Sequence, residues 1–130
     1  MMVMLALVEQ GLDIYLPFGE NTRCDLITDN GRRLSRVQCK TGRLINGCVI
    51  FRPCSTYAHH PNPKISRRAY AGEIDEFAVF CPETRAVYLV PIDDVATEAS
   101  AALRIEPVRN GQVKRVRFAA PYEIARIDIY

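Results

Sequence analysis

Residues 24–43 read CDLITDNGRRLSRVQCKTGR, and this stretch decides how the chain folds. Two strand-like runs, residues 24–29 and 33–41, flank the dipeptide Asn30-Gly31. Asn-Gly between two such runs strongly favours a tight β-hairpin. The sequence therefore predicts two neighbouring antiparallel strands that close near residues 30–31.

Polar side chains stand in these strands where a core would place apolar ones. Successive side chains of a strand point to opposite faces of the sheet. Val37 and Cys39 are therefore expected on one face, and Gln38 and Lys40 on the other. Asp25 lies on the neighbouring strand, within reach of the Gln38 and Lys40 face if the hairpin closes as predicted. An acid, an amide and a lysine are expected to converge on one patch.

Such a trio suits the hydrolysis of phosphodiester bonds. The Asp25 carboxylate, the Gln38 side-chain oxygen and the Cys39 backbone carbonyl are oxygen ligands of the kind that a hard divalent cation prefers. Lys40 could orient or deprotonate an attacking water, or stabilise negative charge on the phosphorane. The alternative from the residues alone is a solvated sheet face with a weak ion pair.

The rest of the chain predicts an α+β domain with a mostly antiparallel or mixed sheet and helices packed on it. A helix over residues 2–10 is expected to stop at Gly11, because glycine favours the left-handed conformation that ends helices. The other expected elements are strands over residues 13–18, 47–53, 76–81 and 86–91, a helix over 92–103, and an edge hairpin around Asn110-Gly111.

Length and composition predict one ordinary globular domain spanning residues 1–130, with 48% apolar and 25% charged residues. No apolar run approaches the length of a membrane span, and the start of the chain lacks the features of a signal peptide. The cysteine count, five, is odd. We therefore expect reduced thiols and a cytoplasmic location.

The charge is strongly segregated along the chain. Residues 31–72 hold nine basic residues and no acid, although the chain has 15 acids and a net charge of only +2. Such a segment indicates a face that binds a polyanion, with DNA as the expected partner. Chance and solubility are the alternative explanation.

The stretch LPFGENTRCDLITDNGRRLSRVQCKTGRLINGCVIFR resembles the PD-(D/E)xK nuclease superfamily, in particular its subgroup of group I intron-encoded homing endonucleases. It is more distantly similar to archaeal Holliday-junction resolvases. Asp25 matches the aspartate that opens the second strand of the site, with Cys24 where the superfamily has proline. Gln38-Cys39-Lys40 matches the (D/E/Q)-x-K triplet in its QxK form. Residues 67–95 are similar to the downstream part of the same subgroup.

The resemblance implies a restriction-endonuclease-like mixed sheet flanked by helices, and a Mg²⁺-dependent (or Mn²⁺-dependent) endodeoxyribonuclease. Asp25 and Gln38 would be metal ligands and Lys40 the catalytic base. The family usually carries a further acid on its first helix, at a position that falls at or before Met1 here, so the first helix is expected to be truncated. Glu9 lies late in that segment, and Glu20 could lend a carboxylate from a loop.

Further basic and aromatic residues are candidates for contacts with the DNA backbone. A solvated basic loop is the alternative explanation for this set. The candidates are Arg43, Tyr57, Lys64, Arg67, Arg68 and Tyr70.

Two other functions are kept beside the nuclease. The first is a catalytically impaired module that binds DNA on the same fold without cutting it. The second is a zinc-stabilised structural domain using Cys48, Cys54, His59 and His60, although their spacing matches no common zinc motif. A homo-oligomer is left open, because nucleases that cut both strands often need two sites.

Overall fold

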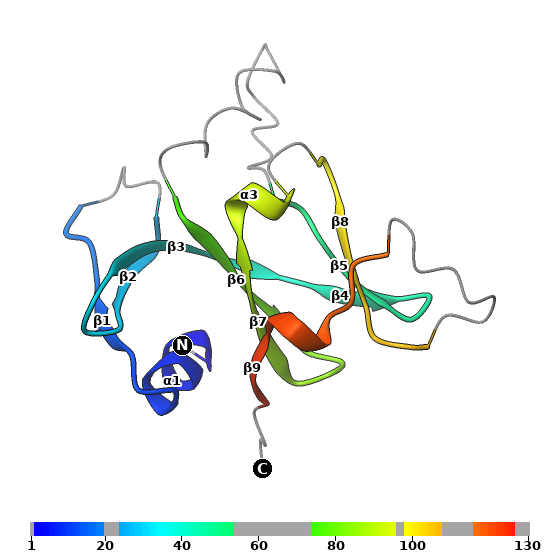
Figure 1. The fold of residues 1–130 in the computed structure, drawn as a ribbon, viewed down its shortest axis with the longest axis horizontal. Coiled ribbons are helices and arrows are strands. Elements are labelled where there is room, and N and C mark those ends of the chain that lie inside the picture. The colour runs from blue at the N-terminus through cyan, green and yellow to red at the C-terminus, as the bar shows by residue number, and fades with distance from the viewer. Residues whose placement is uncertain (1, 20–23, 54–73, 96–97, 108–115, 127–130) are drawn as a thin grey trace.

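The computed structural model describes residues 2–19, 24–53, 74–95, 98–107 and 116–126. These residues form an α+β fold with two sheets and few helices (Figure 1). Its elements are α1 (Met2–Glu9), β1 (Asp13–Tyr15), β2 (Leu26–Asp29), β3 (Leu34–Thr41), β4 (Arg43–Ile45), β5 (Cys48–Phe51), β6 (Glu76–Cys81), β7 (Ala86–Pro91), α3 (Ile92–Val95), β8 (Ala101–Arg104), the 3₁₀ turn η1 (Ala120–Tyr122) and β9 (Glu123–Arg126).

The larger sheet has six strands in the order β1-β2-β3-β6-β7-β9, and the smaller has three in the order β4-β5-β8. Strands β3 and β6 run parallel, whereas the other neighbouring pairs run antiparallel. The larger sheet is therefore mixed, as the sequence predicted. The chain passes from one sheet to the other at Gly42, between β3 and β4.

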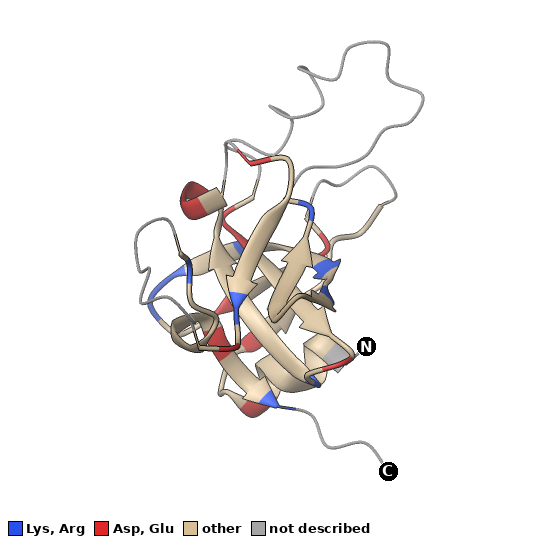
Figure 2. Cartoon of the chain, turned by 90° about the vertical axis from the view of Figure 1, so that its right-hand side faces the viewer, with Lys and Arg blue, Asp and Glu red and all other residues tan. Residues whose placement is uncertain are grey.

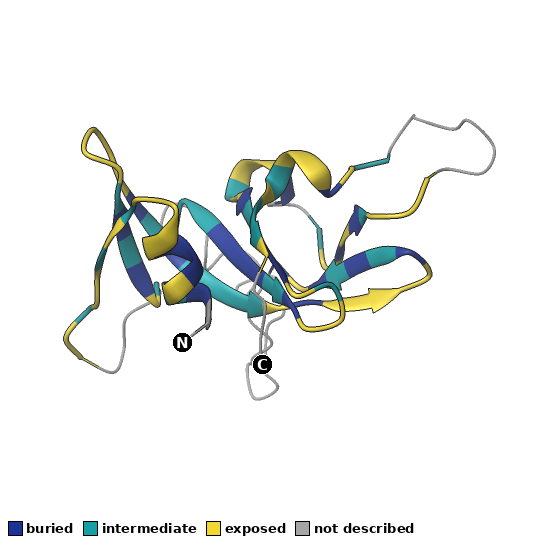
Figure 3. Cartoon of the chain, turned by 90° about the horizontal axis from the view of Figure 1, so that it is seen from below, coloured by how far each residue is buried: buried dark blue, intermediate teal, exposed yellow. Residues whose placement is uncertain are grey.

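Apolar side chains pack on both faces of the larger sheet. On one face, Val3 and Leu7 of α1 pack with Leu26, Val37 and Ala78. The other face is covered by the smaller sheet, α3 and η1, in a cluster that includes Phe51, Phe77, Tyr88, Val95 and Leu103. Buried positions concentrate on the strands, while the turns are exposed (Figure 3). The two-sided burial explains why β6 and β7 are nearly continuous apolar runs.

The first helix and its end follow the prediction. Helix α1 ends at Glu9, and Gly11 adopts φ +85°. The Gly11 N–H donates to the Val8 carbonyl at 2.9 Å, which satisfies one of the carbonyl groups left open at a helix end.

The hairpin forms, but its loop is longer than the Asn-Gly signal predicted. Asp29 pairs with Leu34, so residues 30–33 make a four-residue loop instead of a two-residue turn. The side chain of Asn30 explains the difference, because its Oδ1 accepts the backbone N–H groups of Arg32 and Arg33 at 2.9 and 2.8 Å. A two-residue turn would have paired Asp29 with Arg32, two positions before Leu34. Because a shift of two residues keeps the alternation of side chains, they remain on their predicted faces.

The predicted helix over residues 92–103 is wrong beyond its first turn. Helix α3 covers only Ile92–Val95, and Ala101–Arg104 forms strand β8. Ala101 and Leu103 are buried while Ala102 is exposed, and this alternation suits the pairing of β8 with β5.

Two further differences concern strand pairing. Arg43–Ile45 forms strand β4, where a connection was expected. Arg104 bridges Phe118 in the parallel sense, so the described ends of the predicted edge hairpin do not pair as a hairpin. Its turn at Asn110-Gly111 lies outside the described residues.

None of the helices in the described ranges is long and apolar enough to cross a membrane. Among the cysteines placed by the structure, Cys24, Cys39, Cys48 and Cys81 are free thiols.

Candidate functional site

The site lies where β2 begins, at Leu26. Beyond the pairing of Leu26 with Val37, no strand in the described part of the chain pairs with this edge of β3. The register of the hairpin begins at Leu26, which pairs with Val37. The N–H of Asp25, the preceding residue, donates to the Val37 carbonyl at 2.8 Å. Because the N–H and C=O of one strand residue project to the same side, Val37 presents both groups toward β2. Cys39, two residues further, presents its N–H and C=O to that same side.

The Asp25 carboxylate occupies the place that the missing strand would fill. Its Oδ2 accepts the Cys39 N–H at 2.8 Å. This N–H belongs to the peptide that joins Gln38 to Cys39, so the carboxylate lies directly beside the predicted triplet. The Cys39 carbonyl emerges on the same strand edge. A carboxylate oxygen and a carbonyl oxygen are thus presented side by side.

Gln38 carries a polar atom that the described chain leaves unsatisfied. Its Oε1 is buried and has no hydrogen-bond partner among the residues that the structure places. Leaving a buried acceptor unpaired costs roughly 1–3 kcal/mol, so such atoms call for an explanation. One explanation is that this oxygen serves as a ligand for a cation.

Lys40 follows Gln38 on the same face of β3. Its Nζ lies 6.0 Å from the centroid of the Phe77 ring, at the outer limit of a cation–π contact. Phe77 belongs to the core on the face opposite α1, whereas Cys39 packs toward α1. The predicted alternation of residues 37–40 is therefore present.

A pocket of about 490 Å³ gathers several of these groups. Asp25, Cys39 and Lys40 line it together, and α1 contributes Val3 and Met4. Gln38 is not among its lining residues. The pocket is therefore lined by Asp25, Cys39 and Lys40, and the expected convergence of Asp25 with the Gln38 side chain is not seen in it.

The thiol of Cys39 is held in its protonated, neutral form. Burial, with the negative charge of Asp25 adding to it, raises the pKa of the Cys39 thiol to about 11. The thiol is therefore neutral at physiological pH.

Two oxygen groups at the strand edge suit a hard divalent cation, because the Asp25 carboxylate and the Cys39 backbone carbonyl are ligands of the kind that Mg²⁺ and Mn²⁺ take. The buried Gln38 Oε1 is a ligand of the same kind, but Gln38 does not line the pocket. The described ranges hold no group of three or more His, Cys, Asp or Glu side chains that could hold a metal. The set therefore carries little negative charge.

The first helix brings apolar side chains to this pocket. Met4 and Val3 line it, and Glu9, the acid of α1, is exposed at the end of the helix. Glu20, the second candidate acid, lies outside the described residues.

Of the predicted DNA contacts, Arg43 is placed at the start of β4. Its side chain is 65% exposed, and its Nη1 lies 3.6 Å from Oε2 of Glu83. The other predicted contacts fall outside the described residues: Tyr57, Lys64, Arg67, Arg68 and Tyr70. So do Cys54, His59 and His60 of the zinc alternative.

Asp75 supports the site from the neighbouring strand. Its carboxylate accepts the backbone N–H of Arg36 at 2.7 Å and two guanidinium N–H groups at 3.2 Å, and its own N–H donates to the Arg36 carbonyl. The bonds from the Arg36 guanidinium hold the pKa of the Asp75 carboxyl below its ordinary value. This pair ties strand β3 to the start of β6. No local pattern in the sequence indicated this pairing.

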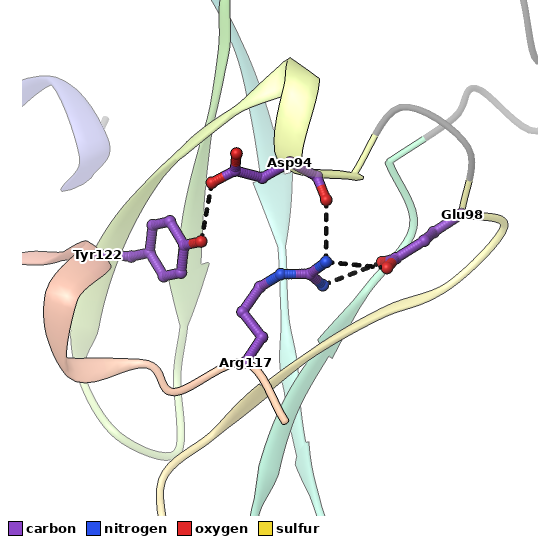
Figure 4. Close-up of polar contacts among 4 residues, drawn as sticks. All are labelled: Asp94, Glu98, Arg117 and Tyr122. Carbon is purple, nitrogen blue, oxygen red and sulfur yellow. Dashed lines mark hydrogen bonds and ion pairs between the residues drawn. The ribbon is translucent and has the colours of Figure 1, made fainter. Parts of the chain in front are cut away.

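A second polar cluster ties the C-terminal segment to α3 (Figure 4). Arg117 donates two hydrogen bonds to the Glu98 carboxylate at 3.0 and 2.9 Å and one to the Asp94 carbonyl at 2.8 Å. Tyr122 donates its hydroxyl to Asp94 Oδ2 at 2.8 Å. Each charged group here has a partner, so we interpret the cluster as a structural clamp.

Comparison with known proteins agrees with this fold. A solved bacterial homing endonuclease matches with a TM-score of 0.65 at 18% sequence identity, over 94% of this chain and 78% of that one. The likeness shows a shared fold. A search of curated proteins found no match. The sequence model of the PD-(D/E)XK endonuclease family matches residues 1–125, and the chain therefore belongs to that family.

Proposed function

We propose that this protein is a Mg²⁺-dependent or Mn²⁺-dependent endonuclease that hydrolyses phosphodiester bonds of DNA through Asp25, Gln38 and Lys40. One observation carries the proposal: the Asp25 carboxylate is held on the Cys39 N–H at 2.8 Å, in a pocket that Lys40 also lines. Family membership supports nuclease chemistry, and the segregated basic charge supports a polyanionic substrate.

The oxygen groups would hold the cation. The Asp25 carboxylate and the Cys39 carbonyl lie on one strand edge, and the orphaned Gln38 Oε1 is the third candidate. When bound, the metal would polarise the phosphate and lower the pKa of a coordinated water. The hydrogen bond from the Cys39 N–H fixes the Asp25 carboxylate before any cation binds, which limits the reorganisation needed.

Lys40 would act on the water and on the charge that develops during attack. Its ammonium group lies 6.0 Å from the centroid of the Phe77 ring, and the residue lines the same pocket as Asp25. A fixed positive charge there can orient the attacking water and stabilise the phosphorane oxygens. To act as the base, Lys40 would have to be the neutral amine, which would take the proton of that water and become the ammonium that stabilises the developing charge.

A DNA-binding module without cleavage is the second candidate. It is favoured by the low charge of the donor set, because α1 contributes Val3 and Met4 to the pocket and no carboxylate. Fewer charged ligands weaken the binding of a divalent cation.

Nicking of supercoiled plasmid separates the two candidates. We expect cleavage that needs Mg²⁺ or Mn²⁺, is abolished by EDTA, and is lost in Lys40→Ala. Arg32→Ala is the matched control, because it removes a cation from the exposed hairpin loop at the other end of β3. Binding of the plasmid without nicking under all these conditions would favour the module. Linear products as well as nicks would indicate two sites acting together.

A further inference from the structure

A second pocket, of about 470 Å³, adjoins the catalytic pocket at the end of β3. Lys40 and Thr41 line both pockets, so the two pockets meet at these residues at the end of β3. The second pocket lies at the passage from the larger to the smaller sheet. The smaller sheet, whose strands β4 and β5 contribute to its lining, is on the side of the molecule that faces the viewer in Figure 2. The walls of the pocket come from β4, β5 and the residue before β8.

The lining of this pocket is basic. Arg43 and Arg52 join Lys40 in it, Thr41 and Ser100 add hydroxyl groups, and none of the lining residues in the described chain is acidic. Two guanidinium groups and an ammonium group on one wall are expected to attract an anion with several charges. Guanidinium groups also bind phosphate oxygens through two parallel hydrogen bonds.

Both arginines are available to a ligand. Arg52 is exposed and makes no ion pair within the part of the chain that the structure describes. Arg43 pairs with Glu83 at 3.6 Å, a long contact between side chains that are 65% and 35% exposed. Exposed pairs of this kind are worth at most about 1 kcal/mol, so a phosphate can displace Glu83.

We propose that this pocket binds the sugar–phosphate backbone of the DNA strand whose neighbouring phosphate enters the catalytic pocket. The inference rests on the proposed function and assigns Arg43 and Arg52 to phosphates on one side of the scissile bond. The shared lining residues Lys40 and Thr41 give the strand its proposed path, from the Asp25 pocket across the end of β3 to Arg52. Contacts of this kind hold the backbone without reading the base sequence.

The test is DNA binding in EDTA, where cleavage cannot occur, measured by fluorescence anisotropy with a labelled duplex over a range of salt concentrations. Removing one cation that binds a phosphate lowers the slope of log K against log[salt] by about 0.9, equivalent to a five- to tenfold loss of affinity near about 0.1 M salt. We expect that loss for Arg52→Ala and Arg43→Ala separately. Because Arg52 and Arg43 are exposed, the variants should keep the wild-type melting temperature.

The control is Arg32→Ala, which removes the same charge at the opposite end of the eight-residue strand β3, about 23 Å away. It should keep the wild-type affinity and slope. An unchanged slope for Arg52→Ala, or an equal loss in Arg32→Ala, overturns the pocket assignment. If binding depends on Arg52 but Mg²⁺ produces no cleavage, the pocket stands and the proposed hydrolysis fails. If the protein cleaves DNA and both Arg43→Ala and Arg52→Ala keep the wild-type DNA affinity, only the pocket assignment fails. Absence of any DNA binding at low salt overturns both.

Discussion

The carboxylate of Asp25 accepts the backbone N–H of Cys39 at 2.8 Å, so an acid side chain completes the hydrogen bonding of a strand that has run past its partner. This relationship places an anionic group at the point where β3 also exposes a carbonyl. The contact gives the Cys39 N–H its hydrogen-bond partner. The same carboxylate is a proposed metal ligand, beside the Cys39 carbonyl.

Asp25→Asn separates those two roles. The amide oxygen of asparagine can still accept the Cys39 N–H, so we expect a melting temperature within a few degrees of the wild type. The negative charge is lost, and Mn²⁺ affinity should fall by about tenfold or more, with plasmid cleavage falling in parallel. Calorimetric titration with Mn²⁺ measures the first effect. Unchanged Mn²⁺ binding would show that Asp25 is no ligand.

Gln38→Met tests whether the buried Oε1 is held for function. Methionine has a similar length and no polar atom, so it removes the unsatisfied acceptor. We expect a gain of about 1 kcal/mol in the free energy of unfolding without metal, together with weaker Mn²⁺ binding and slower cleavage. Urea denaturation in EDTA measures the gain. A destabilised variant would show that the amide has a structural role instead.

Met4→Glu should strengthen metal binding. Met4 lines the pocket beside Asp25, and a carboxylate there adds a charged oxygen ligand. We expect Mn²⁺ affinity to rise by about tenfold. Leu5→Glu is the matched control, because Leu5 is 54% exposed on the same helix, and it should leave the affinity unchanged. Equal effects of the two variants would point to a general charge effect.

Asp75→Asn should destabilise the fold in a pH-dependent way. The folded-state pKa of Asp75 is lowered by Arg36, so its contribution is present above the ordinary carboxyl pKa and is lost as the pH falls through the lowered value. We expect the variant to lose about 1–2 kcal/mol at pH 7, because hydrogen bonds to a charged group are replaced at a partly exposed site. Its deficit against the wild type should disappear in acid. Urea denaturation at several pH values checks this, and a deficit that is independent of pH would contradict it.

The sequence predicted the sheet better than it predicted the parts around it. The alternation of residues 37–40 could be predicted because each residue is either clearly apolar or clearly polar. The packing of Val37 toward α1 and of Lys40 toward Phe77 agrees with it. The loop at Asn30 was predicted too short because a side-chain oxygen, which accepts two N–H groups, decides its length. The prediction of helix at β8 was wrong because alanine-rich sequence favours helix, and only pairing with β5 overrides that preference.

The site was predictable in its residue types and less so in its geometry. The resemblance identified Asp25 and the triplet. The hydrogen bond between Asp25 and Cys39 depends on β2 beginning at Leu26, the residue after Asp25. The pairing of Arg36 with Asp75 joins residues 39 positions apart. No local pattern in the sequence encodes a contact at that separation.

Gly42 has a consequence for how the protein can vary. A Cβ at this position would lie 2.7 Å from Val49 Cγ1 and 3.0 Å from Val79 Cγ1, one in each sheet. Any side chain would therefore push the two sheets apart, and with them Lys40 on one side and Arg43 and Arg52 on the other. Under the proposed function, the absence of a side chain at Gly42 sets the distance between the residues proposed for cleavage and those proposed to bind the DNA backbone, so a substitution there would change both together.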